Sequence, residues 1–434
     1  MASSNNDSML SKMKNKFMDL FPTSSSNNSG TNKNTSKSNT HNNNSGFIYS
    51  ESLGNTINAI QEKVIGNGNV LLSNYILVVS FVLAFLIIIL LYFFSNSFRT
   101  SRTLDGITMY YQYQNISSFN IPNTKQLKLA DVYVASSYNS TLVGYQMFDY
   151  VNELILKSIL RAGVRYIEFN IFNSEFGVNA IPIVSNGYKN GEWKMTLNMI
   201  SFDLICSVIA ENAFITYAGG DIGVPNPDDP LFIGLNLNTN NNIYCLDKLA
   251  DNILYYFRKR MLSSKYTYQQ QNLALSPLSD MKGNVVILAS DGFQGSKLEE
   301  LVNGSWNLST IRRIPYSDLE DPNVDVSNWI EYNKRNLTIV VPHVEGDFWT
   351  QNYDPSIAWK CGCQFVAMNY QIIDAPMDSY ITTFKNYSIS PKGVTLRSNI
   401  EAKKPIKSKK THTPTPTPTN TPTPTPTNTP TPTT

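Results

Sequence analysis

Four polar side chains lie at or just beyond the ends of predicted strands, where enzymes built on parallel sheets hold their reactive groups. They are Glu168, Asn170, Asn186 and Asn236. One carboxylate and three amides would thus stand where a catalytic mouth is expected. Asparagine does not titrate, so Glu168 is the one residue of the four that can exchange a proton. The candidate site therefore has oxygen ligands but little capacity for acid–base chemistry.

The elements that would position these residues alternate along the chain. Short runs rich in β-branched and aromatic residues predict strands, and longer amphipathic stretches predict helices. The clearest strand runs are 164–172, 230–235, 284–290 and 337–342, and the clearest helical stretches are 147–160 and 246–260. This alternation is typical of βα units around a parallel sheet. The region spans about 275 residues, which suits one (β/α)8 barrel of about 250 residues.

A longer motif lies near the end of this region, where residues 352–371 read NYDPSIAWKCGCQFVAMNYQ. The segment resembles the Y-box of eukaryotic phosphoinositide-specific phospholipase C, in which S-N-Y-x-P runs into W-x-x-G-C-Q-x-V-A-L-N-F-Q. The matching residues are Asn352, Tyr353, Pro355, Trp359, Gly362, Cys363, Gln364, Val366, Ala367, Asn369 and Gln371.

Four upstream segments resemble the X-box of the same family, in the family's order. VASSYNSTLVG (134–144) stands in place of S-S-H-N-T-Y-L, and LRAGVRYIEFNIF (160–172) resembles L-x-x-G-C-R-x-V-E-L-D-x-W. IPIVSNG (181–187) resembles P-V-V-Y-H-G, and PLFIGLNLN (230–238) resembles P-V-I-L-S-L-E-N. The chain is identified as a divergent member of this family. The resemblance implies an α/β fold, a TIM-type barrel of the phosphodiesterase kind.

The resemblance also implies a reaction. In the family the inositol 2-hydroxyl attacks its own phosphodiester, two histidines move protons, and calcium stabilises charge. Here Tyr138 stands at the first histidine position and Asn186 at the second, and neither replaces imidazole at neutral pH. The chain's three histidines are His41 and His412, in the tails, and His343. One histidine cannot replace the pair.

The family's calcium positions are depleted as well. They hold Asn139, Glu168, Asn170 and Asn236, with asparagines in place of one aspartate and one glutamate. One negative charge remains in place of three, so we expect calcium to bind weakly or not at all. The family's phosphate-pairing arginine and inositol-packing tyrosine are replaced by Ile339 and Val341. The residues that build the fold are thus kept, while most of those that would take part in the family's reaction are replaced.

The chain outside the barrel divides by composition. Residues 1–68 are rich in Asn and Ser and predict a disordered tail. Residues 75–94 lack charges and predict one transmembrane helix, since about 20 apolar residues cross a hydrocarbon core of about 30 Å. A linker over 99–124, an X-box-like half barrel over 125–293, a Y-box-like half over 305–400, and a basic run with a Thr-Pro tail over 401–434 complete the expected organisation.

Composition limits the partners. A formal net charge of +2 gives no strong electrostatic steering, and no nucleic-acid partner is expected. The four cysteines are too few for a disulfide framework and predict buried free thiols. The span predicts a single-pass membrane protein, although which membrane and which side stay open. The basic residues between 403 and 410 suit an anionic lipid surface or a solvated linker.

Three functions follow from these patterns. The first is a membrane-anchored, catalytically degenerate phospholipase C-like domain that binds a lipid headgroup or an unknown protein partner. The second is an active phosphodiesterase with a remodelled site that uses Glu168, His343, Glu345 or Asp347. The third is a structural membrane or envelope protein whose barrel is a rigid spacer.

Overall fold

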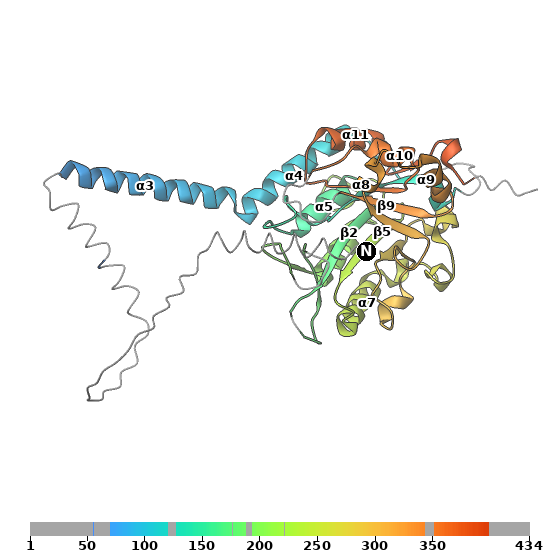
Figure 1. Cartoon of the computed structure of the whole chain (residues 1–434). Helices are drawn as coiled ribbons and strands as arrows, with labels where there is room; N and C mark the ends of the chain where they lie inside the picture. Colours follow the sequence, from blue (N-terminus) through green and yellow to red (C-terminus); the bar gives the residue numbers. More distant parts are fainter. Residues whose placement is uncertain are drawn as a thin grey trace, which may run out of the picture. The chain divides into compact units, whose positions relative to one another are not determined.

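The computed structural model describes Asn55 and residues 70–119, 127–175, 177–187, 193–220, 222–342 and 351–398 (Figure 1). Apart from Asn55, the predicted disordered tail lies outside these residues, as do residues 399–434. The chain divides into two units, residues 1–85 and residues 86–434.

Eight parallel strands form a nearly closed barrel in the second unit. They are β1 (Val132–Ser137), β2 (Tyr166–Asn173), β5 (Leu231–Asn238), β6 (Val285–Ala289), β7 (Gly304–Ser305), β8 (Ile311–Pro315), β9 (Leu337–Val341) and β10 (Phe365–Met368). The strand order is β7-β6-β5-β2-β1-β10-β9-β8, which is chain order around a barrel. Within the described residues no hydrogen-bonded pairing joins β7 to β8. The predicted α/β barrel is confirmed.

Three further strands pair antiparallel at the edges of this barrel. β3 (Pro182–Val184) pairs with β2, and β4 (Ile200–Ser201) pairs with β3. β11 (Ile389–Pro391) pairs with β1. Because β3 reaches the end of β2, the strands β2 and β5 are longer than the rest, at eight residues each. This extension carries the candidate site.

Helices follow most of the parallel strands. They are α5 (Glu153–Arg161), α6 (Phe202–Asn212), α7 (Ile243–Phe257), α8 (Ser317–Glu320), α9 (Val326–Asn333), α10 (Pro355–Lys360) and α11 (Ala375–Thr383). Short 3-10 turns are η1 (Leu129–Asp131), η2 (Arg258–Arg260), η3 (Ser264–Tyr266), η4 (Leu273–Leu275), η5 (Leu278–Met281), η6 (Lys297–Glu300) and η7 (Val394–Leu396). The helix predicted from residue 147 begins only at Glu153, because Phe148 has a φ of 55° and Asn152 caps the helix by accepting from Leu154 N.

Side chains fill the barrel interior. Phe365 of β10 lies 5.1 Å, between ring centroids, from both Tyr166 of β2 and Phe232 of β5. Ile339, Val341 and Tyr138 belong to the same buried cluster. A second cluster lies between the sheet and the helices and includes Ile155, Ile205 and Leu249. All four cysteines are buried and free, as predicted.

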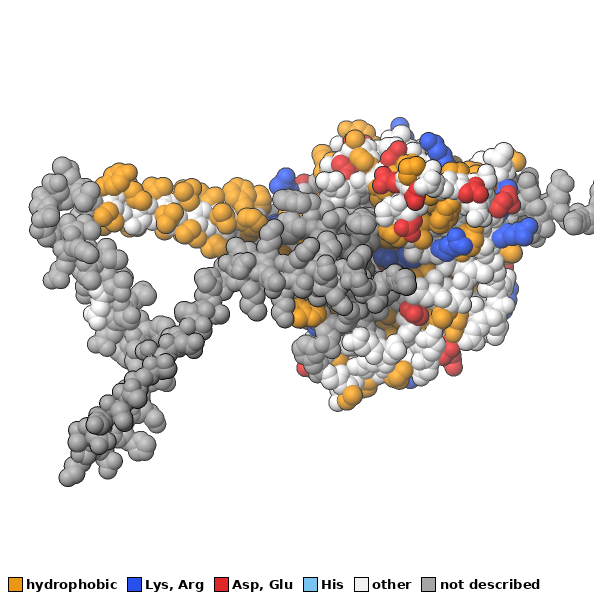
Figure 2. Space-filling model, in the orientation of Figure 1, with side chains coloured by type: hydrophobic (Ala, Val, Ile, Leu, Met, Phe, Trp, Pro, Cys, Tyr) orange, Lys and Arg blue, Asp and Glu red, His pale blue; other side chains and the backbone are white. Residues whose placement is uncertain are grey.

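Helix α3 (Val70–Phe93) is the one described helix that is long and apolar enough to cross a membrane. Its span over Tyr75–Phe93 has a mean hydropathy of 3.2, and none of it is buried. Apolar side chains cover the visible face of this helix (Figure 2).

Residues 96–113, where the sequence predicts a linker from residue 99, form helix α4 (Asn96–Tyr113) instead. Ile107 and Tyr110 of this helix are buried against the barrel. Arg99 also forms an ion pair of 2.5 Å with Asp149, whose side chain is fully buried. The helical spacing of Leu104, Ile107 and Tyr111 was a signal for this helix. The folded domain therefore begins before the region of family resemblance.

A buried lysine lies at the other end of the barrel. Lys392 follows β11, is 0% exposed, and donates from Nζ to the carbonyl oxygen of Gly362 at 2.5 Å. Burial lowers the pKa of this ammonium to about 7, against the opposing effects of Cys363 and Asp131.

This lysine predicts a pH dependence of stability. Between pH 7 and about 8.5 the unfolded chain holds the Lys392 proton and the folded chain releases it, so stability rises with pH by up to about 1.4 kcal/mol per unit. Above that window the cysteines oppose this rise of stability with pH. Burial raises the thiol pKa of Cys245 and Cys363, so their thiols ionise in the unfolded chain before they do in the folded one, which favours unfolding. Chemical unfolding followed by tryptophan fluorescence should show this slope in the wild type and a flatter one in Lys392→Met. Equal slopes in the two proteins would show that Lys392 does not cause this pH dependence of stability.

Candidate functional site

Five of the predicted site residues lie in or just after strands β1, β2, β3 and β5 of the barrel. Asn170 lies opposite Asn236 in the parallel register of β2 and β5. Asn139 comes two residues after β1, and Asn186 comes two residues after β3. Glu168, Asn170 and Asn236 lie within extended strands, not beyond them, because β3 prolongs the pairing of β2.

Four asparagines form one hydrogen-bonded amide network. Asn170 Nδ2 donates to Asn139 Oδ1 and to Asn186 Oδ1, at 2.8 Å each. Asn236 Nδ2 donates to Asn170 Oδ1 at 2.7 Å. Three of these residues are at least nine-tenths buried, and Asn236 is partly buried. Each amide oxygen named here as an acceptor is therefore already engaged within the protein.

Gln146 completes the network, and sequence reasoning missed it. Its Oε1 accepts from Asn139 Nδ2 at 2.8 Å and from Asn186 Nδ2 at 2.9 Å. Its Nε2 donates to Asn369 Oδ1 at 3.3 Å, which links the X-box-like half to the Y-box motif. Gln146 lies in an irregular loop, so no periodic pattern marked it.

The carboxylate of the site is neutralised by a partly buried arginine. Arg313 of β8 donates from Nη2 to Glu168 Oε1 at 2.7 Å and from Nε to the same oxygen at 3.2 Å. Tyr166 Oη donates to Glu168 Oε2 at 2.7 Å. Glu168 is 0% exposed and Arg313 is 14% exposed. Burial lowers the pKa of Arg313, but the nearby Glu168 carboxylate outweighs it and holds that pKa above its ordinary value.

Gly234 makes room for this arrangement. It lies opposite Glu168 in the sheet, and a Cβ at that position would overlap the hydroxyl of Tyr166.

Arg313 itself was not predicted. Its signal is the alternation of β8, in which Ile311 points into the barrel and residue 313, two positions on, shares its face.

The remaining predicted positions that the structure describes hold buried side chains. Ile339 and Val341 of β9 are 0% and 1% exposed and lie in the barrel core. Tyr138 is 1% exposed, and its ring centroid lies 5.9 Å from Arg313 Cζ. Burial raises the pKa of Tyr138 well above its ordinary value. His343, Glu345 and Asp347 lie outside the described residues.

Comparison with models of known protein families shows which family this barrel belongs to. Residues 126–290 match the model of the phosphatidylinositol-specific phospholipase C X domain, and residues 286–398 match that of its Y domain. Together the two matches span well over half of the chain. The chain belongs to the phosphatidylinositol-specific phospholipase C family.

Individual relatives agree with this phospholipase C assignment. The chain is 27% identical over 129 residues to human 1-phosphatidylinositol 4,5-bisphosphate phosphodiesterase beta-2, covering 29% of this chain and 10% of that protein. It is 32% identical over 102 residues to human inactive phospholipase C-like protein 2, covering 23% of this chain and 9% of that protein. The matches thus span about a tenth of the length of these curated relatives.

Solved structures share the phospholipase C barrel fold. The crystal structure of S. officinalis PLC21 superposes with a TM-score of 0.52 at 19% identity, covering 63% of this chain and 38% of that one. The L. pealei PLC21 structure gives 0.51 at 20% identity, with the same coverage.

Proposed function

We propose that this chain is a membrane-anchored phospholipase C-like domain in which hydrolysis has been lost and the barrel serves as a binding module. The observation that supports it is the state of the family's reactive positions. They hold a closed network of neutral amides and one carboxylate that is paired with Arg313. A human relative described as an inactive phospholipase C-like protein is consistent with such a loss.

Neither histidine position can move a proton near neutral pH. The buried phenol of Tyr138 stays protonated, because burial raises its pKa above an ordinary value that is already near 10. Asn186 donates from Nδ2 to Gln146 and accepts at Oδ1 from Asn170, so its amide is fully engaged. General acid and base catalysis have no group to use at these two positions.

The residues present do not suit a calcium ion. Calcium needs six to eight oxygen ligands with enough negative charge, and the amide oxygens of Asn139, Asn170 and Asn186 already accept hydrogen bonds from neighbouring amides. An ion binding at Glu168 would also have to displace the Arg313 guanidinium. The internal cation and a divalent cation compete for the same carboxylate.

Thermal melts with calcium and with chelator should therefore nearly coincide. A millimolar dissociation constant would stabilise the fold by only about 0.4 kcal/mol at about 1 mM calcium. Differential scanning fluorimetry of the full-length protein is the measurement, with magnesium as the matched control. A large, calcium-specific rise in melting temperature would mean that the ligands have been misassigned.

The anchoring part of the proposal rests on helix α3. Its uncharged span over Tyr75–Phe93 is long enough to cross a bilayer, and its side chains are exposed except for that of Ile89, which is partly buried. A basic run near residues 403–410 would add attraction to anionic lipid if it faces a cytoplasmic leaflet.

Carbonate extraction tests the anchor. We expect full-length protein to stay in the membrane pellet at alkaline pH, because burial of apolar side chains in lipid does not depend on charge. A matched variant with three leucine-to-lysine changes in α3, at Leu83, Leu86 and Leu90, should move to the supernatant. Recovery of the wild type in the soluble fraction would refute the span.

A further inference from the structure

An asparagine followed two residues on by serine or threonine is a sequon, the acceptor sequence for an N-linked glycan. Among the described residues six asparagines begin a sequon: Asn115, Asn139, Asn303, Asn307, Asn336 and Asn386. The glycan is transferred on the lumenal side of the membrane, while the chain enters and before it has folded. Whether the fold can hold a glycan at each position therefore bears on which side of the membrane the barrel lies.

Two of the six sequons begin inside the folded barrel. Asn139 is 5% exposed and Asn303 is 4% exposed. In each, the amide nitrogen that would carry the glycan already donates within the protein, from Asn139 to Gln146 Oε1 at 2.8 Å and from Asn303 to the Tyr266 carbonyl oxygen at 3.1 Å. A glycan is bulky and needs solvent, whereas a protein interior is close-packed. Neither asparagine could keep its observed position once modified.

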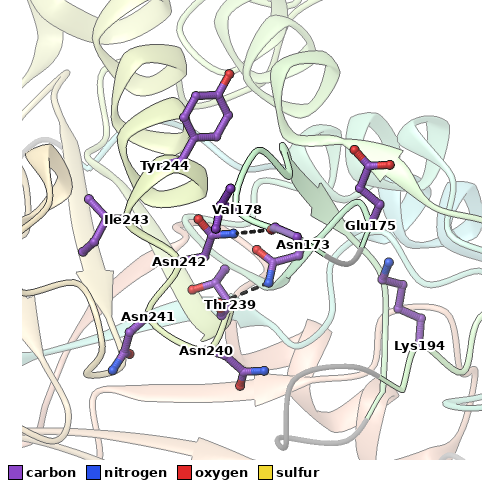
Figure 3. A pocket seen from close by; sticks show the side chains of 11 residues that line it. Asn173, Glu175, Val178, Lys194, Thr239, Asn240, Asn241, Asn242, Ile243 and Tyr244 are labelled. Atoms are coloured by element: carbon purple, nitrogen blue, oxygen red, sulfur yellow. Dashed lines mark hydrogen bonds between the residues drawn. The ribbon is translucent and has the colours of Figure 1, made fainter.

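Three other sequons begin at exposed residues, Asn115, Asn307 and Asn386, and Asn336 is partly buried. Exposed asparagines also lie elsewhere on the barrel, such as Asn240 at the pocket where β2 and β5 end (Figure 3), but this one begins no sequon. A barrel that entered the lumen would receive glycans at the exposed sequons and would be blocked from folding by those at the buried ones. The fold is therefore compatible with the cytoplasmic side.

The charges beside helix α3 favour the same side. Cytoplasmic flanks carry an excess of Lys and Arg, counted within about 15–20 residues of the span. Arg99 and Arg102 follow the span closely, and Lys63 is the one basic residue in the corresponding stretch before it. The lysines between residues 12 and 16 lie outside this window. The excess is therefore on the barrel's side of α3.

The cysteines fit a reducing compartment. All four, Cys206, Cys245, Cys361 and Cys363, are buried and free. Disulfides form in oxidising compartments such as the lumen of the endoplasmic reticulum, whereas the cytoplasm keeps thiols reduced. A chain folding in the lumen would expose these four thiols to oxidation before the barrel buried them.

We propose that α3 holds the barrel on the cytoplasmic side of the membrane and residues 1–68 on the opposite side. N-linked glycans are then carried by this amino-terminal tail alone, at the sequons that begin at Asn6, Asn27, Asn34 and Asn43. The topology depends on the membrane anchor proposed above. It also places the basic run near residues 403–410 on the side where the leaflet carries anionic lipid.

Protease protection in sealed microsomes tests the topology. The full-length protein, with a different epitope tag at each end, is expressed in cultured mammalian cells. We expect added protease to remove the carboxyl-terminal tag and to leave the amino-terminal tag on a protected fragment until detergent opens the vesicles. Protection of the carboxyl-terminal tag, with loss of the amino-terminal one, would overturn the proposal.

Glycosidase treatment gives an independent readout. The wild type should show a glycosidase-sensitive shift in gel mobility. A tail variant, Asn6→Gln/Asn27→Gln/Asn34→Gln/Asn43→Gln, should lose this shift. The matched barrel variant, Asn115→Gln/Asn307→Gln/Asn386→Gln, changes exposed side chains and should keep it in full. A wild type without any shift, or loss of the shift in the barrel variant, would contradict the proposed topology.

Carbonate extraction of the same microsomes separates this topology from the anchor itself. A chain that stays in the membrane pellet with its carboxyl-terminal tag protected overturns the topology and leaves the proposed function standing. A chain recovered in the supernatant refutes the anchor, and the topology fails with it.

Discussion

We expect the full-length protein to release no inositol phosphate from mixed micelles of phosphatidylinositol or its phosphates, with or without calcium. Loss of a general acid or base typically costs roughly 10²- to 10⁴-fold in rate per group, and both positions have changed, to Tyr138 and Asn186. Loss of metal assistance adds several kcal/mol to the barrier. Together these losses place turnover below detection.

The assay needs three controls. An active phospholipase C shows that the micelles are competent, and heat-treated protein gives the background. The variant Tyr138→His/Asn186→His should also remain at background, because two calcium-binding carboxylates of the family are still asparagines and its phosphate-pairing arginine and inositol-packing tyrosine are still Ile339 and Val341. Wild-type release clearly above background, and lost in Glu168→Gln, would instead establish a remodelled catalytic site.

The variant Arg313→Met should lower the free energy of unfolding by about 3–5 kcal/mol, because it leaves the Glu168 carboxylate buried without a counter-charge. For a domain of this size the melting temperature should fall on the order of 10 °C. Chemical unfolding and thermal melts of the full-length protein measure both quantities.

Two further variants show that the loss comes from an unpaired charge. Glu168→Gln/Arg313→Met removes both charges and should recover most of the stability. Arg312→Met, on the same strand, removes an exposed guanidinium whose Cζ lies 3.7 Å from the Tyr332 ring centroid, and should cost only about 0.5–1 kcal/mol. If Arg312→Met and Arg313→Met were equally mild, Glu168 would not depend on its partner.

Local patterns were enough to predict four of the eight barrel strands, β2, β5, β6 and β9. A buried strand reads as a short run of β-branched and aromatic residues, and residues 337–342 and 284–290 became β9 and β6. They were also enough to predict the long apolar helix α3, because an uncharged apolar run of about 20 residues has the length and composition of a helix that can cross a membrane. Helix α4 was missed although Leu104, Ile107 and Tyr111 have helical spacing, because its polar residues suggested a linker.

The sequence by itself determined the family and the chemistry that its positions lack. Motif order and residue type identify a histidine or a carboxylate as replaced without any coordinates. Only the tertiary structure decided which side chains the residues at those positions contact. Arg313 pairs with Glu168 across 145 residues of sequence, and Gln146 reaches Asn369 across 223. Such contacts exist because the closing barrel brings distant strand ends to one edge. A pattern that spans only a few residues therefore could not reveal them.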